Sequence, residues 1–257
     1  MEQSAGFIID LDGTLYRGSE RLPFAREFVE RIRGRGAQFL IMTNNATRTP
    51  EEVAAHLSRL GISAEAGEVF TSAQAAVCYL EERGGGRRVF CVGERGLSSL
   101  LEQAGFELVD RGADYVVQGL DRSFDYGKLS RAVALIREGA AFIMTNPDRR
   151  FPIEGGFVPG AGSIGAAIAA AAGVEPVVIG KPSPIIMKYA LEKIGMPPSR
   201  VWMVGDNALT DMAAGKASGC RTALVLTGYS TRAEGEAAQV DVIAGDLREF
   251  AEHAGLA

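Results

Sequence analysis

Residues 7–15 read Phe-Ile-Ile-Asp-Leu-Asp-Gly-Thr-Leu, and this stretch decides which fold to expect. The three apolar residues at its start are typical of a short strand that is buried on both faces, as in a parallel sheet. Asp10 and Asp12 follow directly, and Gly13 permits a sharp turn of the backbone. Two carboxylates at a strand end are costly to bury unless a cation or hydrogen-bond donors lie near them. The stretch therefore predicts a strand that delivers paired aspartates to a functional site, rather than two solvated turn residues.

Short apolar runs alternate with helical segments along the neighbouring chain. Segment 24–35 carries apolar side chains on one helical stripe, and residues 39–42 form a second strand-like run. Thr49, Pro50 and Glu52 then form the capping pattern of a helix start. This alternation predicts an α/β fold with a Rossmann-like, three-layer core, in which helices cover both faces of a parallel sheet.

A change in composition near residue 83 indicates a second domain. The stretch 83–88 reads Arg-Gly-Gly-Gly-Arg-Arg, which is typical of a loop or junction. Further strand and helix patterns follow, and a Gly-Lys-Pro sequence at 180–182 precedes another series of them. We therefore expect an outer core formed by residues 1–77 and 180–257, with an α/β domain of residues 78–179 inserted into it.

A second pair of carboxylates follows a late strand candidate at residues 201–204. Asp206 would lie at the carboxyl end of that strand, and Asp211 in the first turn of the next helix. Hard cations such as Mg²⁺ take oxygen ligands. We therefore expect Asp10 and Asp206 to bind a Mg²⁺ ion. Asp211 is expected to lie beside these ligands without binding the ion directly.

Two further elements suit a phosphate group. Thr43 and Asn44 end the second apolar run and offer a hydroxyl and backbone N–H groups, while Lys181 offers a fixed cation. Taken alone, Thr43 also fits an ordinary turn hydroxyl, and Lys181 also fits a solvated surface lysine. Their order along the chain, between the two aspartate pairs, is what points to phosphate chemistry.

Charge and composition exclude several classes of protein. Lys plus Arg number 27 and Asp plus Glu number 32, so the formal charge is −5, which argues against a nucleic-acid partner. The most apolar stretch, 161–180, is rich in Ala and Gly and is interrupted by Glu175 and Pro176, so we expect no membrane segment. Only two histidines are present, which argues against a histidine-based zinc site or a Ser-His-Asp triad.

The expected location is cytoplasmic. The three cysteines form no Cys-x-x-Cys pair, and such sparse, odd usage fits a reducing compartment. Glu2 is acidic and no apolar segment follows it, so we also expect no secretory signal peptide.

The order of the four elements resembles that of the haloacid dehalogenase superfamily of phosphohydrolases, in particular its NagD-like subfamily with a type IIA cap. The resemblance implies that Asp10 is the nucleophile and that Asp12 is the general acid and base. It also implies that Mg²⁺ is held by Asp10, Asp206 and the backbone carbonyl of Asp12. Thr43, Lys181 and backbone amides near Asp12 and Asn44 would hold the phosphoryl oxygens.

In that family the inserted cap selects the substrate, here expected to be a small phosphorylated metabolite. Asn146 and Asp148, with the neighbouring Arg149 and Arg150, are candidate cap contacts, although the two arginines equally fit exposed loop charges. A homodimer formed through the cap is a further expectation.

Three functions use the same aspartyl-phosphate chemistry. The preferred one is a Mg²⁺-dependent phosphatase; a phosphotransferase or mutase would pass the phosphoryl group to another hydroxyl instead of water. A phospho-aspartate binding module would accept phosphate without turnover, but such a module has no use for the acid and base at Asp12. Sugar phosphates, phosphoglycolate-like acids, nucleoside monophosphates and pyridoxal phosphate all stay open as substrates.

Overall fold

The computed structural model describes residues 5–153 and 156–256, and the chain divides into two compact units. Glu2, on which the expectation about a signal peptide rests, lies outside the described residues. We call the two units the core unit and the inserted unit. The core unit comprises the chain up to Thr43, Pro50–Phe70 and the chain from Lys181 onward, and the inserted unit comprises Asn44–Thr49 and Thr71–Gly180.

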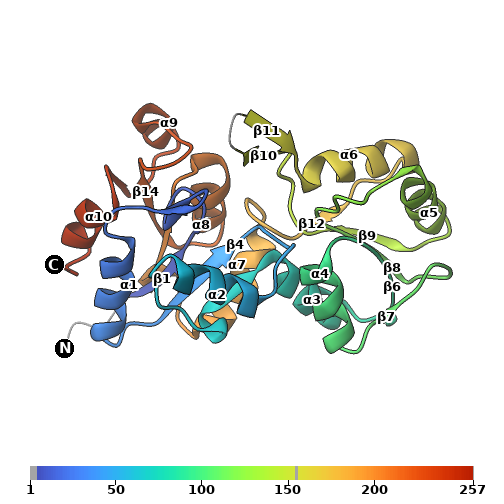
Figure 1. The fold of residues 1–257 in the computed structure, drawn as a ribbon, viewed down its shortest axis with the longest axis horizontal. Helices are drawn as coiled ribbons and strands as arrows, with labels where there is room; N and C mark the ends of the chain where they lie inside the picture. The colour runs from blue at the N-terminus through green and yellow to red at the C-terminus, as the bar shows by residue number, and fades with distance from the viewer. Residues whose placement is uncertain (1–4, 154–155, 257) are drawn as a thin grey trace. The chain divides into compact units, whose positions relative to one another are not determined.

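A six-stranded sheet in the order β15-β14-β13-β1-β4-β5 forms the centre of the core unit (Figure 1). Every neighbouring pair from β15 to β4 is parallel. From β1 the chain runs to β4 and β5 on one side, whereas β13, β14 and β15 lie on the other, so the strand order reverses beside β1. The strands are β1 (Gly6–Ile9), β4 (Phe39–Thr43), β5 (Val69–Thr71), β13 (Val201–Gly205), β14 (Arg221–Val225) and β15 (Val242–Ala244).

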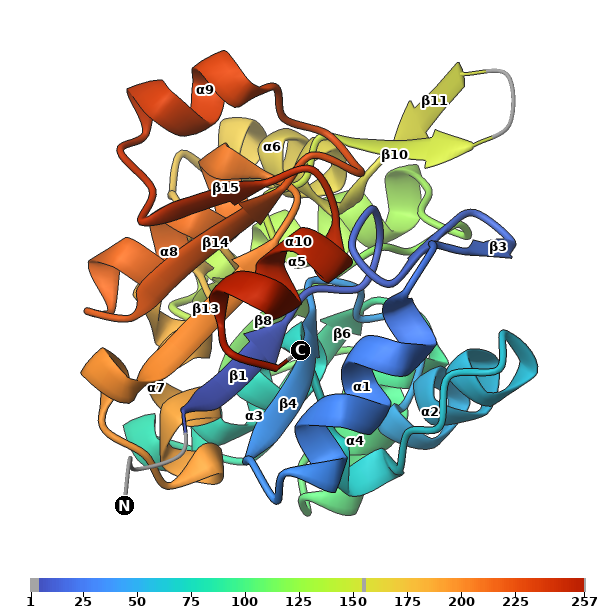
Figure 2. The same cartoon turned by 90° about the vertical axis from the view of Figure 1, so that its left-hand side faces the viewer.

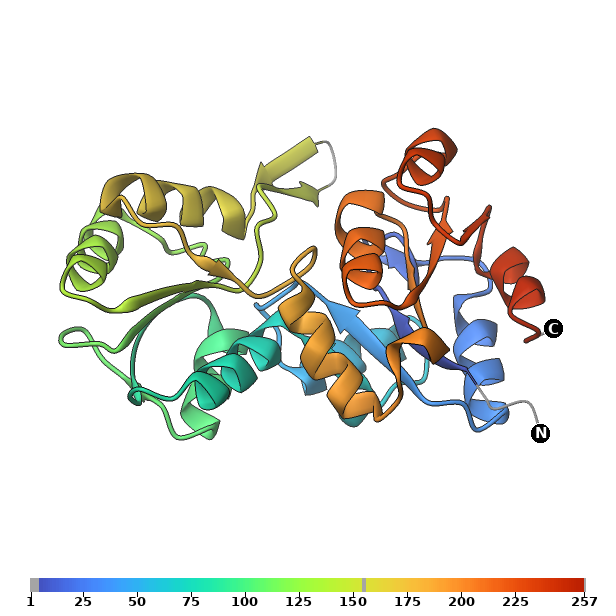
Figure 3. The ribbon, with the colours of Figure 1, turned by 180° about the vertical axis from the view of Figure 1, so that it is seen from behind.

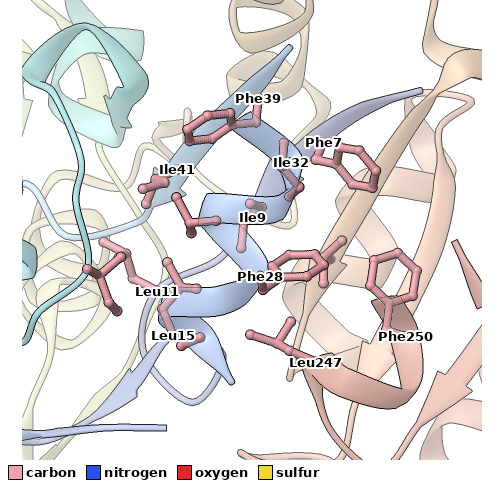
Figure 4. Close-up of a cluster of buried hydrophobic side chains, with 14 of the residues drawn as sticks. Phe7, Ile9, Leu11, Leu15, Phe28, Ile32, Phe39, Ile41, Leu247 and Phe250 are labelled. Atoms are coloured by element: carbon pink, nitrogen blue, oxygen red, sulfur yellow. The ribbon is translucent and has the colours of Figure 1, made fainter. Parts of the chain in front are cut away.

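Alternation along β1 divides its side chains between two buried faces. Phe7 and Ile9 belong to a large apolar cluster, in which Phe28 and Phe250 contact Phe7 edge-on at centroid distances of 6.2 and 6.5 Å (Figure 4). Ile8 points to the opposite face and is equally buried. Because both faces are apolar, the strand reads as a continuous apolar run, as expected for a central parallel strand.

Helices cover both faces of the core sheet. Figure 2 shows α1 and α10 in front of the sheet, and Figure 3 shows α7 and α8, in orange, on its other face. A short antiparallel hairpin, β2 (Tyr16–Arg17) with β3 (Glu20–Arg21), follows β1. The helices of the core unit are α1 (Ala25–Gly34), α2 (Pro50–Arg59), α7 (Pro184–Ile194), α8 (Ala213–Ala217), α9 (Arg232–Ala237) and α10 (Leu247–His253), with shorter turns at Ala66–Glu68, Pro198–Arg200 and Ala208–Met212.

The inserted unit has its own parallel sheet, in the order β12-β9-β8-β6-β7. Helices α5 and α6 cover one face and α3 and α4 the other (Figure 1). A separate antiparallel pair, β10 with β11, precedes α6. The elements are α3 (Ser72–Arg83), β6 (Arg88–Val92), α4 (Arg95–Gln103), β7 (Glu107–Leu108), β8 (Tyr115–Gln118), α5 (Tyr126–Arg137), β9 (Ala141–Met144), β10 (Arg150–Ile153), β11 (Gly156–Pro159), α6 (Ala161–Ala172) and β12 (Val177–Val178).

The predicted fold class is confirmed: the chain is α/β, with parallel sheets covered by helices on both faces. The helix predicted at 24–35 is α1, and the helix predicted to open at Pro50 is α2. The glycine-rich stretch 83–88 connects the end of α3 to β6. Within the described part of the chain, no helix is both long and apolar enough to cross a membrane.

Truncation of Phe28 should destabilise the core unit strongly. Its side chain is fully buried and contacts both Phe7 and Phe250, so Phe28→Ala removes a large apolar group and leaves a cavity. We expect a loss of about 3–5 kcal/mol in the free energy of unfolding, measured by urea denaturation followed by circular dichroism. Glu27→Ala, on the exposed face of the same helix, should change stability by less than about 0.5 kcal/mol. Equal effects of the two variants would contradict this packing.

Candidate active site

The candidate site lies where β1 and β13 end side by side. Ile9 pairs with Val204, and the Asp10 N–H donates to the carbonyl of Val204 at 2.8 Å. Asp10 and Asp206 therefore leave neighbouring strands at the same edge of the sheet. This edge is also where the strand order reverses, the usual position of ligand sites in open α/β sheets.

Three carboxylates converge at this edge. Asp10, Asp206 and Asp211 each contribute an oxygen to a group in which all the atoms lie within 4.8 Å of one another. All three residues are buried, with exposed fractions of 8%, 6% and 1%. The structure thus brings Asp10 of the first motif together with Asp206 and Asp211 of the second.

Local structure holds Asp211 against the strand end. It lies in the π-helical turn Ala208–Met212, and its Oδ2 accepts from the N–H of Asn207 at 3.0 Å. A Cβ at Gly205 would lie 2.4 Å from the same oxygen, so only glycine permits this close packing. With Oδ1 bonded to Lys181, both oxygens of Asp211 accept from protein donors, which fits a supporting role.

Lys181 places a buried ammonium group among these carboxylates. Its Nζ donates to Asp10 Oδ1 and, at 2.7 Å, to Asp211 Oδ1. Burial alone would lower the pKa of Lys181, but attraction to the two carboxylates outweighs it and raises the pKa above its usual value. Lys181 is therefore a permanent cation.

The cluster carries more negative charge than Lys181 can balance. Burial raises the pKa of Asp10, and the nearby Asp211 and Asp206 add to the rise. Burial and repulsion from Asp211 also raise the pKa of Asp206, to about 7. Buried, oxygen-only ligands with excess negative charge fit a hard divalent cation such as Mg²⁺. The positive charge of a bound cation would stabilise the ionised carboxylates of Asp10 and Asp206.

Asp12 differs from these residues because its side chain is exposed. The hydroxyl of Tyr16 donates to Asp12 Oδ2 at 3.2 Å. Gly13 has a left-handed φ of +86°, and a Cβ there would lie 2.3 Å from Asp206 Oδ2. The chain can therefore turn directly after Asp12, against the Asp206 carboxylate, only with glycine at position 13.

The loop of residues 227–230 supports the site and was not identified from the sequence. Thr227 donates through Oγ1 to the carbonyl of Gly13 at 2.7 Å, and the Tyr229 N–H donates to Asp206 Oδ2 at 2.6 Å. A Cβ at Gly228 would lie 1.8 Å from that same oxygen. The available signal was a Thr-Gly pair two residues after the end of β14, a strand whose carboxyl end lies at the same edge as that of β13.

The phosphate-binding candidates Thr43 and Asn44 fall in different units. Thr43 is the buried last residue of β4, beside β1 in the core unit. Asn44 belongs to the inserted unit, where its Nδ2 donates to Asp148 Oδ2 at 3.2 Å. Its backbone carbonyl accepts from Ser72 Oγ at 2.6 Å and from Asn146 Nδ2 at 2.8 Å.

All four cap candidates lie in the inserted unit. The side chain of Asn146 is 5% exposed and bonds the Asn44 carbonyl and, through Oδ1, the N–H of Asp148. Asn146 and Asp148 together thus hold Asn44 within the inserted unit. Arg149 and Arg150 are exposed, and the Arg150 guanidinium lies over the ring of Phe157.

Comparison with known proteins gives consistent results over nearly the whole chain. A model of haloacid dehalogenase-like hydrolases matches residues 7–107, and a second, HAD-hydrolase-like model matches residues 178–250. An acid sugar phosphatase of Staphylococcus aureus (strain MRSA252) is 44% identical over 232 residues, which cover 90% of each chain. The 5'-nucleotidase YutF of Bacillus subtilis (strain 168) is 41% identical over 232 residues, covering 90% of this chain and 91% of that protein.

Solved structures agree in fold over almost the entire length. A double mutant of a thermostable NPPase from Geobacillus stearothermophilus superimposes with a TM-score of 0.91 at 38% identity, covering 96% of this chain and 98% of that one. NagD from E. coli K-12 gives the same TM-score at 32% identity, with the same coverage. The α/β fold of almost the whole chain is therefore shared with these proteins.

Replacement of Gly228 should disable the Asp206 carboxylate. In Gly228→Ala the new Cβ would overlap the whole Asp206 side chain, at 1.8 Å from Oδ2 and 2.5 Å from Cβ, so Asp206 must move. We expect the rise in melting temperature on adding Mg²⁺ to fall to near zero, because cation binding no longer stabilises the native state. Gly34→Ala, where nothing lies within 4 Å, should keep the full rise. An unchanged rise in Gly228→Ala would contradict the placement of the loop.

The raised pKa of Asp206 predicts a pH-dependent stability of the protein without cation. The native state holds a proton up to about pH 7, whereas an unfolded aspartate releases it near pH 4. The contribution of this group to stability therefore falls as pH rises between these values. In EDTA, Asp206→Asn should gain about 5–10 °C in melting temperature relative to wild type between about pH 5 and pH 7.5. Asp110→Asn, an exposed control, should show a constant difference from wild type. If the melting temperatures of Asp206→Asn and wild type differed by the same amount at every pH, the raised pKa of Asp206 would be refuted.

Proposed function

The chain belongs to the haloacid dehalogenase-like hydrolase family, and from this premise we propose that it hydrolyses a small phosphate monoester with Mg²⁺, through an aspartyl-phosphate on Asp10. It is a hydrolase of the phosphatase type. The observation that carries the proposal is the buried group of Asp10, Asp206, Asp211 and Lys181 at the edge of the core sheet. This group combines a nucleophile, cation ligands and a fixed positive charge.

In the first step, a carboxylate oxygen of Asp10 attacks phosphorus and the bond from phosphorus to the leaving oxygen breaks. Asp12 gives its proton to that oxygen, so the alcohol leaves uncharged. In the second step water attacks the aspartyl-phosphate, Asp12 takes the water's proton, and inorganic phosphate leaves. Asp10 and Asp12 thereby return to their starting states.

The surrounding residues balance the charge of the phosphoryl group. Bound Mg²⁺ would be held by Asp10, Asp206 and the Asp12 carbonyl, and it supplies positive charge that reduces repulsion between the phosphate and the nucleophile. Lys181 and Thr43, with backbone amides near Asp12, would hold the phosphoryl oxygens, and the contribution expected from Asn44 stays a prediction. Asp211 keeps Lys181 in place through its 2.7 Å contact.

We assign substrate selection to the insert predicted at residues 78–179. Two relatives above are named as an acid sugar phosphatase and a 5'-nucleotidase, and a further similar structure, 34% identical, is named as a p-nitrophenyl phosphatase from Archaeoglobus fulgidus, so these substrate classes form the panel for this chain. Contacts of Asn146 and Asp148 with the substrate stay predictions, and so do contacts of Arg149 and Arg150 with it. A cytoplasmic location and a homodimer through the insert also stay predictions; light scattering of the purified protein distinguishes dimer from monomer.

Phosphate release from 4-nitrophenyl phosphate tests the proposal. We expect turnover with Mg²⁺, its loss in EDTA, and a fall of ~10³-fold or more in kcat for Asp10→Asn, because the nucleophile is removed. Asp110→Asn, an exposed aspartate of the inserted unit, should retain wild-type turnover. Undiminished turnover in Asp10→Asn would sink the mechanism.

The alternative functions give different products. A phosphotransferase or mutase would release less inorganic phosphate than 4-nitrophenol when a sugar is added as acceptor. A phospho-aspartate binding module would form a stable adduct at Asp10 with acetyl phosphate and release almost none. Equal amounts of 4-nitrophenol and phosphate, with and without added sugar, support hydrolysis.

A further inference from the structure

The turn after Asp12 brings Tyr16 back beside it. The Gly13 N–H donates to the Tyr16 carbonyl at 2.7 Å, and the Leu15 N–H donates to the Leu11 carbonyl at 2.8 Å. Asp12 and Tyr16 also form an isolated β-bridge. These backbone contacts close residues 11–16 into a compact turn. The side chain at position 16 is therefore placed next to the Asp12 carboxyl.

The Tyr16 side chain is fixed, whereas Asp12 is exposed. Tyr16 is 7% exposed, and its ring meets that of His56 from α2 edge-on, with centroids 5.1 Å apart and an interplanar angle of 84°. From this position its hydroxyl donates to Asp12 Oδ2 at 3.2 Å. An exposed aspartate otherwise samples several rotamers, and a donor on a rigid ring favours one of them.

We propose that Tyr16 is a positioning residue that orients Asp12 for proton transfer, a role that rests on the proposed phosphatase function. Tyr16 keeps its own proton throughout and donates it as a hydrogen bond to Oδ2. The proton exchanged with the leaving group and with water is then carried by Oδ1. A carboxyl in one orientation delivers its proton at a defined place, which is what efficient acid catalysis requires.

The role predicts a selective defect. An ester with a poor leaving group depends on the proton from Asp12, whereas 4-nitrophenolate leaves readily without it. Phenyl phosphate and 4-nitrophenyl phosphate share a ring but differ in this respect, since unsubstituted phenol has a pKa near ~10. In Tyr16→Phe we expect kcat/KM to fall about tenfold on phenyl phosphate, near the upper end of what losing one neutral hydrogen bond costs, and less than ~3-fold on 4-nitrophenyl phosphate.

Three controls separate positioning from a structural defect. Tyr16→Phe keeps the ring against His56, and its melting temperature should match wild type within about 2 °C. Tyr79→Phe removes a hydroxyl from the inserted unit, where it accepts from Arg83, and should leave the ratio of the two substrates unchanged. On an Asp12→Asn background, Tyr16→Phe should have no further effect on that ratio, because it acts through Asp12.

The possible outcomes are distinct. An equal fall on both esters, or a selective fall that persists on the Asp12→Asn background, would overturn the role of Tyr16 while leaving the phosphatase assignment intact. Absence of phosphate release by the wild-type protein from either ester would instead refute the proposed function itself.

Discussion

The buried ammonium of Lys181 is the contact on which the arrangement of the candidate site depends. It bonds Asp10 and Asp211, and it thereby joins segments that lie 171 and 30 residues away along the chain. An unpaired charge buried at this depth would cost several kcal/mol, so each partner stabilises the others in position. Lys181 is also the first residue of the returning core chain, so charge pairing anchors the point where that chain re-enters its unit.

Local patterns in the sequence predict much of this architecture. The runs before Asp10 and Asp206 are short, continuously apolar and followed by polar residues. This pattern predicts strands, because central parallel strands are apolar on both faces. Parallel strands share a carboxyl edge, so two aspartate motifs that follow two such strands are expected to meet, as Asp10 and Asp206 do. Asp211 follows from its helical spacing after Asp206.

The remaining features depend on contacts that no local pattern encodes. Gly228 matters because the loop after β14 folds back onto Asp206, and only the packed chain reveals a 1.8 Å approach. Asn44 follows Thr43 directly, yet its hydrogen bonds to Asn146 and Asp148 place it in the other unit. The Tyr16 hydroxyl bonds Asp12 across a local turn, but its ring is held by His56 of α2, a contact that only the folded chain reveals. Side chains that act through distant partners carry no periodic signal.

The position of β1 has a consequence for the order of assembly. Its neighbour β13 begins at Val201, so during synthesis the first strand must wait for almost two hundred residues before its second partner exists. The inserted unit is nearly continuous in sequence and completes its own sheet earlier. Pairing over such separations is slow because loop closure precedes the gain from the contacts. One edge of β1 therefore lacks its partner strand until most of the chain has been synthesised.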